Sequence, residues 1–249
     1  MKNRKYSLFF IFQIILTLIA VSAVILPIFL SQIPWPSFAR DYLELNGVKE
    51  SGAQNLVSAI YLGYRAYDTL GETIVLLVAV SGTISIVSHS GISLAKGFNE
   101  EPLIKKTNKD LPFSRRTELV DVVTGKLGPI VLMFGLYVML FGHLTPGGGF
   151  QGGVVIASGI VFIALGSKTE SSTPLQEAGV LAKIEAAGFL SLILASLAGI
   201  PGGFGYFGNP LSQSGVSPVS YIILLNIIIG LKVGAGIGFM CIAMLGRTE

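Results

Sequence analysis

The sequence predicts an all-α integral membrane protein with about six transmembrane helices, on two observations. Hydrophobic residues make up 51% of the 249 residues, whereas only 12% are charged and the mean hydropathy is +0.72. Soluble domains carry about 25% charged residues, so this chain lacks the charge to cover a water-exposed surface. The apolar residues also gather into six runs, each close to the ~20 residues that a helix needs to cross a bilayer.

The six runs define the predicted spans, and the first of them has two interpretations. They cover residues 7–30, 70–95, 127–145, 150–167, 178–200 and 218–246. Basic residues before the first run, and Val21-Ser22-Ala23 within it, also fit a cleavable signal peptide, which would leave five spans. The run continues to Leu30 without a polar break, and this length favours a retained helix.

The positions of Lys and Arg predict the orientation. With a cytoplasmic N-terminus, only Arg40, Lys49 and Arg65 of the 17 basic residues fall in outer segments, and Lys232 lies inside the last span. The others lie in inner segments, as the positive-inside rule requires. We therefore expect a multi-pass protein of the cell membrane, surrounded by the lipid bilayer, with both termini cytoplasmic.

The spans fall into two groups separated by a polar stretch. Residues 1–95 form a two-helix unit with an outer loop at 31–66. Residues 96–126 are polar and of mixed charge, which is typical of a cytoplasmic linker. Residues 127–249 form a four-helix domain of two hairpins.

Composition excludes several classes of function. The net charge of +3 is too small for a nucleic-acid footprint, so we expect no nucleic-acid partner. One cysteine, Cys241, and two histidines leave no ligand set for a disulfide framework, a zinc site or an iron–sulfur cluster in this chain alone. We expect no metal or cofactor in this chain and no catalysis by it alone, since no nucleophile–base set is visible.

A glycine-rich turn joins the third and fourth spans. Residues 147–152 match G-x-G-x-x-G, but that dinucleotide fingerprint needs a preceding strand, and here it joins two apolar runs. The turn residues of interest are Pro146, Gly147, Gly148, Gly149 and Phe150. Glycine allows the backbone to turn tightly, and its exposed peptide groups then need water or a neighbouring protein. A similar turn at 201–203 hints at an internal duplication.

Two carboxylates and two histidines lie near the ends of predicted spans. Asp68 and Glu72 are four residues apart and share one helix face. Their mutual repulsion favours a carboxyl that exchanges a proton or binds a cation, but negative charge is also favoured at any helix N-terminus. His89 lies near the inner end of the same helix, and His143 lies beside the glycine turn. Each histidine has two interpretations: it relays protons during transport, or it is a polar side chain in contact with water at the membrane surface.

Glu185 and Lys232 lie deeper in the membrane. Glu185 is about seven residues into its span, and Lys232 is near the middle of the last span. A charge at the bilayer centre costs at least ~2.5–3.5 kcal/mol, which makes it a functional-site hypothesis; the alternative is a structural ion pair of Lys232 with Glu185 or Glu177. In the same span, a stripe of small residues at Gly230, Gly234 and Gly238 predicts close helix packing, and Asn226 can hydrogen-bond to a neighbour.

The run from His143 to Gly153, HLTPGGGFQGG, strongly resembles the signature of the MnhB subunit of Mrp-type (Mnh-type) sodium/proton antiporters. The four-helix stretch 120–246 has the size and span pattern of that subunit. The segment from Arg65 to Glu72, RAYDTLGE, looks like the C-terminal end of the MnhA subunit of the same antiporters. The two pieces are usually on separate polypeptides, whereas here they share one chain.

The resemblance implies a subunit that works inside a larger complex and helps to move sodium ions and protons. By this resemblance Asp68 and Glu72 correspond to acidic residues implicated in ion translocation, and Pro146 and Phe150 match turn positions of functional interest. The implied partners are other Mrp-type membrane subunits. Related modules occur in archaeal membrane-bound hydrogenases and sulfur reductases, where redox subunits with iron–sulfur clusters are further partners.

Three hypotheses follow for the function. In the first, protonation changes at Asp68, Glu72, His89 and Lys232 help to carry ions, with Glu185 and His143 as further candidates. In the second, the chain is a scaffold that joins antiporter and redox subunits. An independent transporter is the third, and it is disfavoured because no pair of broken helices or polar substrate site is evident.

Overall fold

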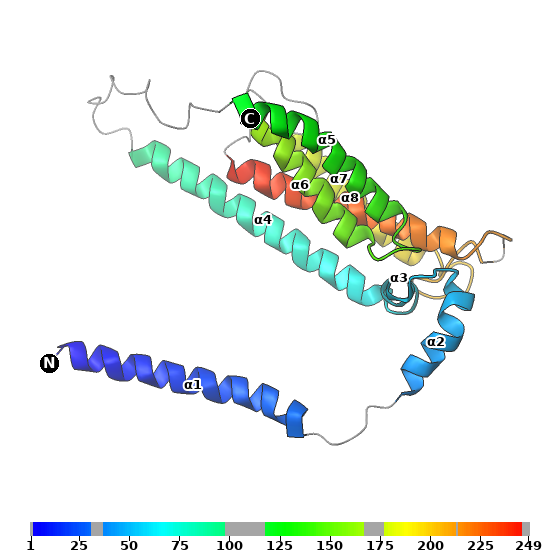
Figure 1. Ribbon diagram of the computed structural model, residues 1–249, viewed down its shortest axis with the longest axis horizontal. Helices are drawn as coiled ribbons and strands as arrows, with labels where there is room; N and C mark the ends of the chain where they lie inside the picture. Colours follow the sequence, from blue (N-terminus) through cyan, green and yellow to red (C-terminus); the bar gives the residue numbers. More distant parts are fainter. Residues whose placement is uncertain (1, 31–36, 98–117, 167–176, 213, 246–249) are drawn as a thin grey trace. The chain divides into compact units, whose positions relative to one another are not determined.

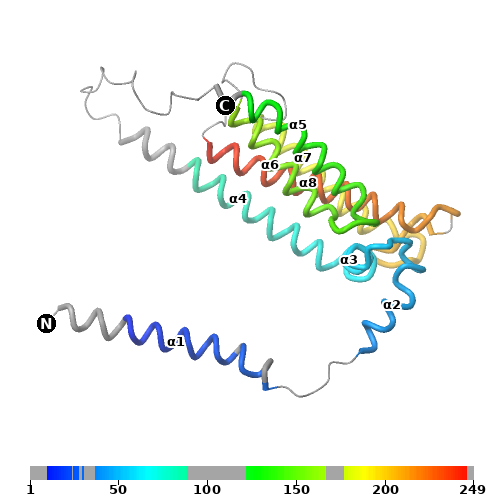
Figure 2. Tube along the Cα trace, viewed as in Figure 1, coloured from blue at the N-terminus to red at the C-terminus, as the bar shows by residue number. Residues whose placement is uncertain are grey.

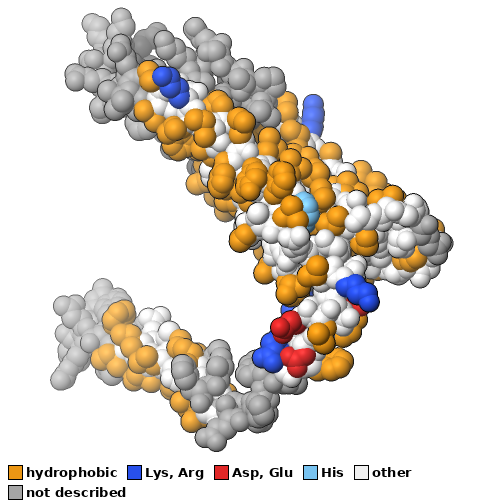
Figure 3. Space-filling model, turned by 45° about the vertical axis from the view of Figure 1, so that its right-hand side comes forward, with side chains coloured by type: hydrophobic (Ala, Val, Ile, Leu, Met, Phe, Trp, Pro, Cys, Tyr) orange, Lys and Arg blue, Asp and Glu red, His pale blue; other side chains and the backbone are white. Residues whose placement is uncertain are grey.

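The computed structural model describes residues 2–30, 37–97, 118–166, 177–212 and 214–245 (Figure 1), and no β-strand occurs among them. Six of the helices are long and apolar enough to cross a membrane, which confirms the predicted fold class. Hydrophobic side chains cover most of the described surface of the long helices, as lipid contact requires (Figure 3). The chain divides into two compact units, residues 1–41 and 42–249.

The first unit consists mainly of α1 (Lys2–Leu30), which contains the apolar window Phe10–Pro27. Its described side chains are exposed; Phe12, for example, is 61% exposed. Thr17 satisfies its hydroxyl within the helix by donating to the carbonyl of Gln13. The helix therefore presents apolar groups on all sides, as expected for a span that contacts lipid or another protein.

The second unit is a bundle arranged around one central helix. It contains α4 (Ala66–Gly97), α5 (Glu118–Leu140), α6 (Gly149–Gly166), α7 (Ala178–Leu197) and α8 (Val219–Met244). The central helix is α8, which packs against α4, α6 and α7 (Figures 1 and 2). It supplies Leu225, Ile229 and Val233 to the main hydrophobic core.

Glycines let α8 and α6 approach closely. A Cβ on Gly153 would lie 2.7 Å from the carbonyl of Gly230, and one on Gly234 would lie 3.1 Å from the carbonyl of Gly153. Gly238 faces Ile160 and Leu181. The small-residue stripe of α8 therefore has the packing role that the sequence predicts.

The predicted loop at 31–66 contains helical structure that the hydropathy pattern missed. Helices α2 (Phe38–Ser51) and α3 (Leu56–Ser58) and the π-helix η1 (Ala59–Tyr64) precede α4, which begins at Ala66 rather than residue 70. These segments are too short or too polar to register as spans. Helix α5 begins at Glu118, inside the stretch predicted as a linker, and ends at Leu140, before the glycine turn. There Gly147 and Gly148 adopt φ values of 148° and 154°, which other residues rarely adopt.

Candidate functional site

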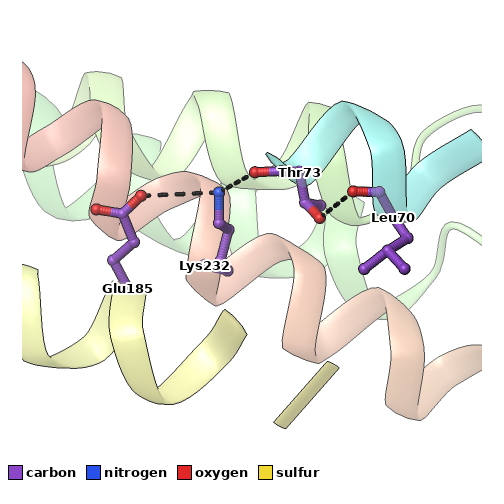
Figure 4. A network of polar contacts seen from close by, with 4 residues as sticks. All are labelled: Leu70, Thr73, Glu185 and Lys232. Atoms are coloured by element: carbon purple, nitrogen blue, oxygen red, sulfur yellow. Dashed lines mark hydrogen bonds and ion pairs between the residues drawn. The ribbon is translucent and has the colours of Figure 1, made fainter. Parts of the chain in front are cut away.

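A lysine lies fully buried at the centre of the bundle. Lys232, near the middle of α8, has 0% of its surface exposed. Its Nζ donates a 2.7 Å hydrogen bond to the backbone carbonyl of Thr73 on α4 and lies 3.7 Å from Oε1 of Glu185 on α7 (Figure 4). The hydroxyl of Thr73 donates in turn to the carbonyl of Leu70. Three helices thus meet at one ammonium group, and its carboxylate partner is Glu185 rather than Glu177.

Two glycines make room for this pair. A Cβ on Gly188 of α7 would lie 2.9 Å from the Cβ of Lys232, and a Cβ on Gly236 of α8 would lie 2.7 Å from Oε1 of Glu185. Each charged residue therefore packs against a glycine of the other helix. This reciprocal arrangement brings two charged side chains between helices without separating their backbones.

The hydrogen bonding of the Lys232–Glu185 pair is incomplete. Glu185 is 4% exposed, and its Oε1 accepts no hydrogen bond from any residue that the structure describes. Burying two charges costs several kcal/mol per ion, which their attraction repays only when further hydrogen bonds complete the geometry. Transfer of a proton from the ammonium of Lys232 to the carboxylate of Glu185 gives a neutral pair that avoids this cost, so the arrangement is chemically suited to proton exchange.

A second polar cluster surrounds the glycine turn between α5 and α6. Asn55 Nδ2 donates to the carbonyls of Gly142 (2.8 Å) and Thr145 (2.9 Å), and the hydroxyl of Ser58 donates to the same Gly142 carbonyl at 2.8 Å. Asn55 is also the N-cap of α3, where its side chain accepts from the amide of Val57. The turn is therefore fastened to the segment that leads into η1, and the carbonyls of Gly142 and Thr145 are satisfied within the protein.

The same cluster reaches α8 through Asn226, which is 0% exposed. Asn226 Oδ1 accepts a 2.7 Å hydrogen bond from the amide of Gly149, the first residue of α6. The hydroxyl of Tyr61 on η1 lies beside Gly148, 3.3 Å from the hydroxyl of Ser58. The interhelical hydrogen bond expected for Asn226 is thus made to the glycine turn.

The two carboxylates of α4 are exposed in this chain. Asp68 forms an ion pair with Arg65, and its side chain is 50% exposed. Glu72 is exposed and lies one residue before Thr73, whose carbonyl binds Lys232. The backbone of Glu72 is therefore next to the buried pair, whereas its side chain is directed to the surface of the bundle. Asp68 lies in the first turn of α4, where negative charge is favoured at a helix N-terminus.

The predicted histidine and turn residues lie in different surroundings. The backbone of His89 belongs to α4, but its side chain lies outside the described residues. His143 Nδ1 donates to the carbonyl of Leu140 at 3.0 Å, and its own carbonyl accepts from the amide of Asn55. Pro146 is exposed, while Phe150 packs against the main core. Within the described parts of the chain, no group of three or more His, Cys, Asp or Glu side chains converges as a metal site requires.

Sequence reasoning missed Thr73, Gly188, Asn55, Ser58 and Tyr61. Thr73 contributes its backbone carbonyl, and because every residue type has one, the sequence carries no signal for this contact. Gly188 could have been found, because it lies three residues after Glu185 on the same helix face. The others lie in the segment predicted as a loop.

A cavity of about 200 Å³ lies beside η1. Its walls include Glu50, Tyr64, Phe207, Asn209 and Tyr221. Glu50 accepts hydrogen bonds from the hydroxyls of Tyr42 (2.8 Å) and Tyr64 (2.6 Å), and these bonds lower the pKa of its carboxyl. Burial, aided by Glu50, raises the pKa of Tyr64 to about 12. These hydrogen bonds fasten the end of α2 to η1.

A fold of six membrane-capable helices with a charged pair in its core defines a multi-pass membrane protein. The family model of a domain related to the MnhB subunit of Na+/H+ antiporters matches residues 119–239. The chain is 32% identical over 114 residues to the corresponding Na+/H+ antiporter subunit of Bacillus subtilis, covering 43% of this chain and 73% of that protein. The protein belongs to this family of MnhB-related antiporter subunits.

Two further relatives extend the match beyond that domain. The chain is 33% identical over 200 residues to an uncharacterized protein of Methanocaldococcus jannaschii, covering 74% of each. It also resembles a chain in the structure of the membrane-bound sulfane sulfur reductase, an archaeal respiratory membrane complex. The TM-score is 0.67 and the identity 26%, and the match covers 93% of this chain and 97% of that one. The protein is thus related both to antiporter subunits and to a component of a respiratory membrane complex.

Proposed function

We propose that this chain is a subunit of a multisubunit sodium/proton-translocating membrane complex and that Lys232 and Glu185 form a proton-exchanging pair in its ion pathway. The observation that carries the proposal is the burial of Lys232 in the bundle core, where its ammonium contacts one carbonyl and one incompletely bonded carboxylate. An ionisable residue inside a membrane bundle is expensive, and its usual justification is a pathway for ions or protons.

The transported species in this proposal are sodium ions and protons, because relatives of the chain are Na+/H+ antiporter subunits. The partners are other Mrp-type membrane subunits. The likeness to a chain of a sulfur reductase supports redox subunits with iron–sulfur clusters as additional partners. In this proposal Glu72 meets a neighbouring membrane protein of the complex, since its carboxylate is exposed on α4, one residue before the Thr73 carbonyl that binds Lys232.

A structural scaffold is the second candidate, and the glycine packing of α8 favours it. Close contacts at Gly153, Gly188 and Gly236 bind the bundle together around the charged pair. In this case the pair contributes to assembly, and its replacement by a neutral pair of similar size leaves transport intact.

Replacing both charges at once distinguishes the two functions. The single variants Lys232→Met and Glu185→Gln each leave one buried charge unpaired, whereas the double variant leaves none. Each is expressed in the intact complex, whose assembly is measured by native gel and whose Na+-dependent proton transport is measured in membrane vesicles. Lys183→Met, at an exposed lysine on α7, is the matched control.

We expect the double variant to assemble normally and to lose transport, because the proton-exchanging groups are gone. Normal transport by an assembled double variant would exclude the pair from the pathway and support the scaffold. The control is expected to transport and assemble like the unmodified complex.

A further inference from the structure

The cavity beside η1 has room for a small organic molecule and one carboxylate on its wall. Its volume is about 200 Å³. A single water molecule needs roughly 10–15 Å³, and an apolar cavity of about 150 Å³ binds benzene. Glu50 is the only charged residue among the described residues that line the cavity. A ligand of a few heavy atoms with a positive charge therefore fits both its size and its charge.

The carboxylate of Glu50 has acceptor capacity left for such a ligand. Its Oε1 accepts from the hydroxyl of Tyr42 and its Oε2 from the hydroxyl of Tyr64, and these bonds lower the pKa of the carboxyl. A carboxylate can accept about four hydrogen bonds, so these two leave about two unused. Within the described parts of the chain, Glu50 forms no ion pair. The group is thus held in place by hydroxyls while its negative charge stays available to a cation.

Three aromatic residues, Tyr64, Phe207 and Tyr221, also line the cavity. The hydroxyl of Tyr221 is fixed by a 2.8 Å hydrogen bond to the carbonyl of Ala195. The ring of Phe207 packs edge-on against that of Tyr206, with 5.2 Å between the ring centroids. Aromatic rings attract organic cations and also offer carbon surface to an alkyl chain. The wall is therefore pre-formed for a ligand that has both a positive charge and carbon atoms.

The backbone of Phe207 adopts a conformation that costs free energy. Its φ of 60° lies in the left-handed region, which a bulky side chain rarely adopts. A 2.8 Å hydrogen bond from its amide to the carbonyl of Ser196 holds this conformation, and the side chain lies at the cavity with 8% of the residue exposed. Residues strained in this way cluster at ligand-binding sites. The strain therefore supports a binding role for the cavity.

We propose that this cavity binds a primary ammonium group on a short alkyl chain, with the ammonium at Glu50 and the carbon atoms against Phe207 and Tyr221. The N–H groups of the ammonium donate charge-assisted hydrogen bonds to the carboxylate. An anion is disfavoured by the charge of Glu50, and a bare metal cation would leave the aromatic wall unused. A free amine and the head group of an aminophospholipid both carry this group. The inference does not depend on the proposed transport function.

Saturation-transfer NMR of ethylammonium chloride with the purified, delipidated complex tests the site. We expect ethylammonium to bind, and we expect Glu50→Gln to raise its dissociation constant by about tenfold or more, because the charge is lost. Glu44→Gln, at another exposed carboxylate of α2, is the matched control and should bind like the unmodified complex. Absence of binding, or equal binding by the two variants, overturns the proposal.

A second variant leaves Glu50 and its hydrogen bonds in place, because Glu50 also connects α2 to η1. Gly63→Leu adds a side chain at the cavity wall, where an added Cβ would meet nothing within 4 Å. Gly71→Leu is the matched control, since Gly71 has the same open space and does not line the cavity. We expect Gly63→Leu to abolish the binding of ethylammonium and Gly71→Leu to leave it unchanged. Retained binding in Gly63→Leu overturns the proposal.

Further probes test the chemistry of the ligand and its source. Propanol, a neutral compound of similar size, should not bind, and sodium chloride at matched ionic strength should not displace ethylammonium; the opposite result with either probe overturns the proposal. Nanodiscs of phosphatidylethanolamine and of phosphatidylglycerol then separate the two sources. Loss of ethylammonium binding only in phosphatidylethanolamine identifies the lipid head group as the ligand, whereas binding in both identifies a free amine. Loss in both membranes overturns the proposal for the membrane-embedded complex.

Discussion

The carboxylate of Glu185 packs directly against Gly236, so that a Cβ at position 236 would lie 2.7 Å from Oε1. This contact and the matching one between Lys232 and Gly188 place the charged pair between α7 and α8 without a gap. The site is therefore sensitive to the smallest possible increase in side-chain volume.

Gly236→Ala is expected to displace the carboxylate of Glu185 from Lys232. Overpacking of a tight site costs about 1–3 kcal/mol, which exceeds the helix-propensity gain of replacing glycine. The measurement is thermal unfolding of the complex together with Na+-dependent transport, and both should fall. Gly179→Ala, on an exposed position of α7 with nothing within 4 Å of the added Cβ, should leave both at their original values. Equal unfolding temperatures and equal transport in the two variants would show that the contact between Gly236 and Glu185 does not limit the size of the residue at position 236.

Replacements of Lys232 and of Glu185 should have strongly coupled effects on the free energy of unfolding. Lys232→Met leaves Glu185 buried and uncompensated, and breaking a buried pair in this way costs about 3–5 kcal/mol. Adding Glu185→Gln to that variant should recover most of the loss, because no buried charge is left. Denaturant unfolding of the four proteins in a double-mutant cycle measures the coupling. Additive losses would mean that the two side chains do not interact.

The long helices were predictable because membrane spanning depends on hydropathy, which the sequence shows directly. Lys232 and Glu185 were found from their depth in the spans, and their contact follows from the structure. The hydrogen bond to Thr73 was not predictable, because a backbone carbonyl has no residue-specific signal. Helix α2 was missed because its residues are mostly polar, with Asp41 and Lys49 near its two ends. The role of Asn55 depends on contacts across a large separation in sequence.

The two carboxylates of α4 should differ in importance. Glu72→Gln is expected to reduce sodium-dependent transport while leaving assembly intact, since its carboxylate is exposed to a neighbouring subunit and its backbone adjoins Thr73, whose carbonyl binds Lys232. Asp68→Asn should have the smaller effect, because Asp68 is half exposed and neutralised by Arg65. Transport at several sodium concentrations compares the two variants in the same complex. Normal transport by the Glu72 variant would remove this residue from the mechanism.

Acid should loosen the connection between α2 and η1. Hydrogen bonds from Tyr64 and Tyr42 lower the pKa of Glu50, so the ionised carboxylate favours the folded connection above its ordinary pKa of 4.5. This contribution is lost as the pH falls below that value and through the lowered pKa. The protection of residues 42–64 against hydrogen exchange, corrected for the intrinsic pH dependence of exchange, should therefore fall as the pH is lowered from about 5 to about 3, a range that begins just above about 4.5. Glu50→Gln should remove this loss of protection; an unchanged pH dependence would assign it to other groups.

Asn55→Ala should release the glycine turn from the segment before η1. The variant loses the hydrogen bonds to Gly142 and Thr145 as well as the helix cap at Val57. At about 1 kcal/mol for each bond, the loss should be about 2–4 kcal/mol. Asn46→Ala is the matched control, since Asn46 makes a single 3.2 Å bond within α2. Hydrogen exchange at residues 142–149 should rise in the first variant and not in the second. Transport should fall with it, because the end of the same turn is bound by Asn226 of α8, the helix that carries Lys232. A released turn with normal transport would separate the glycine cluster from the ion pathway.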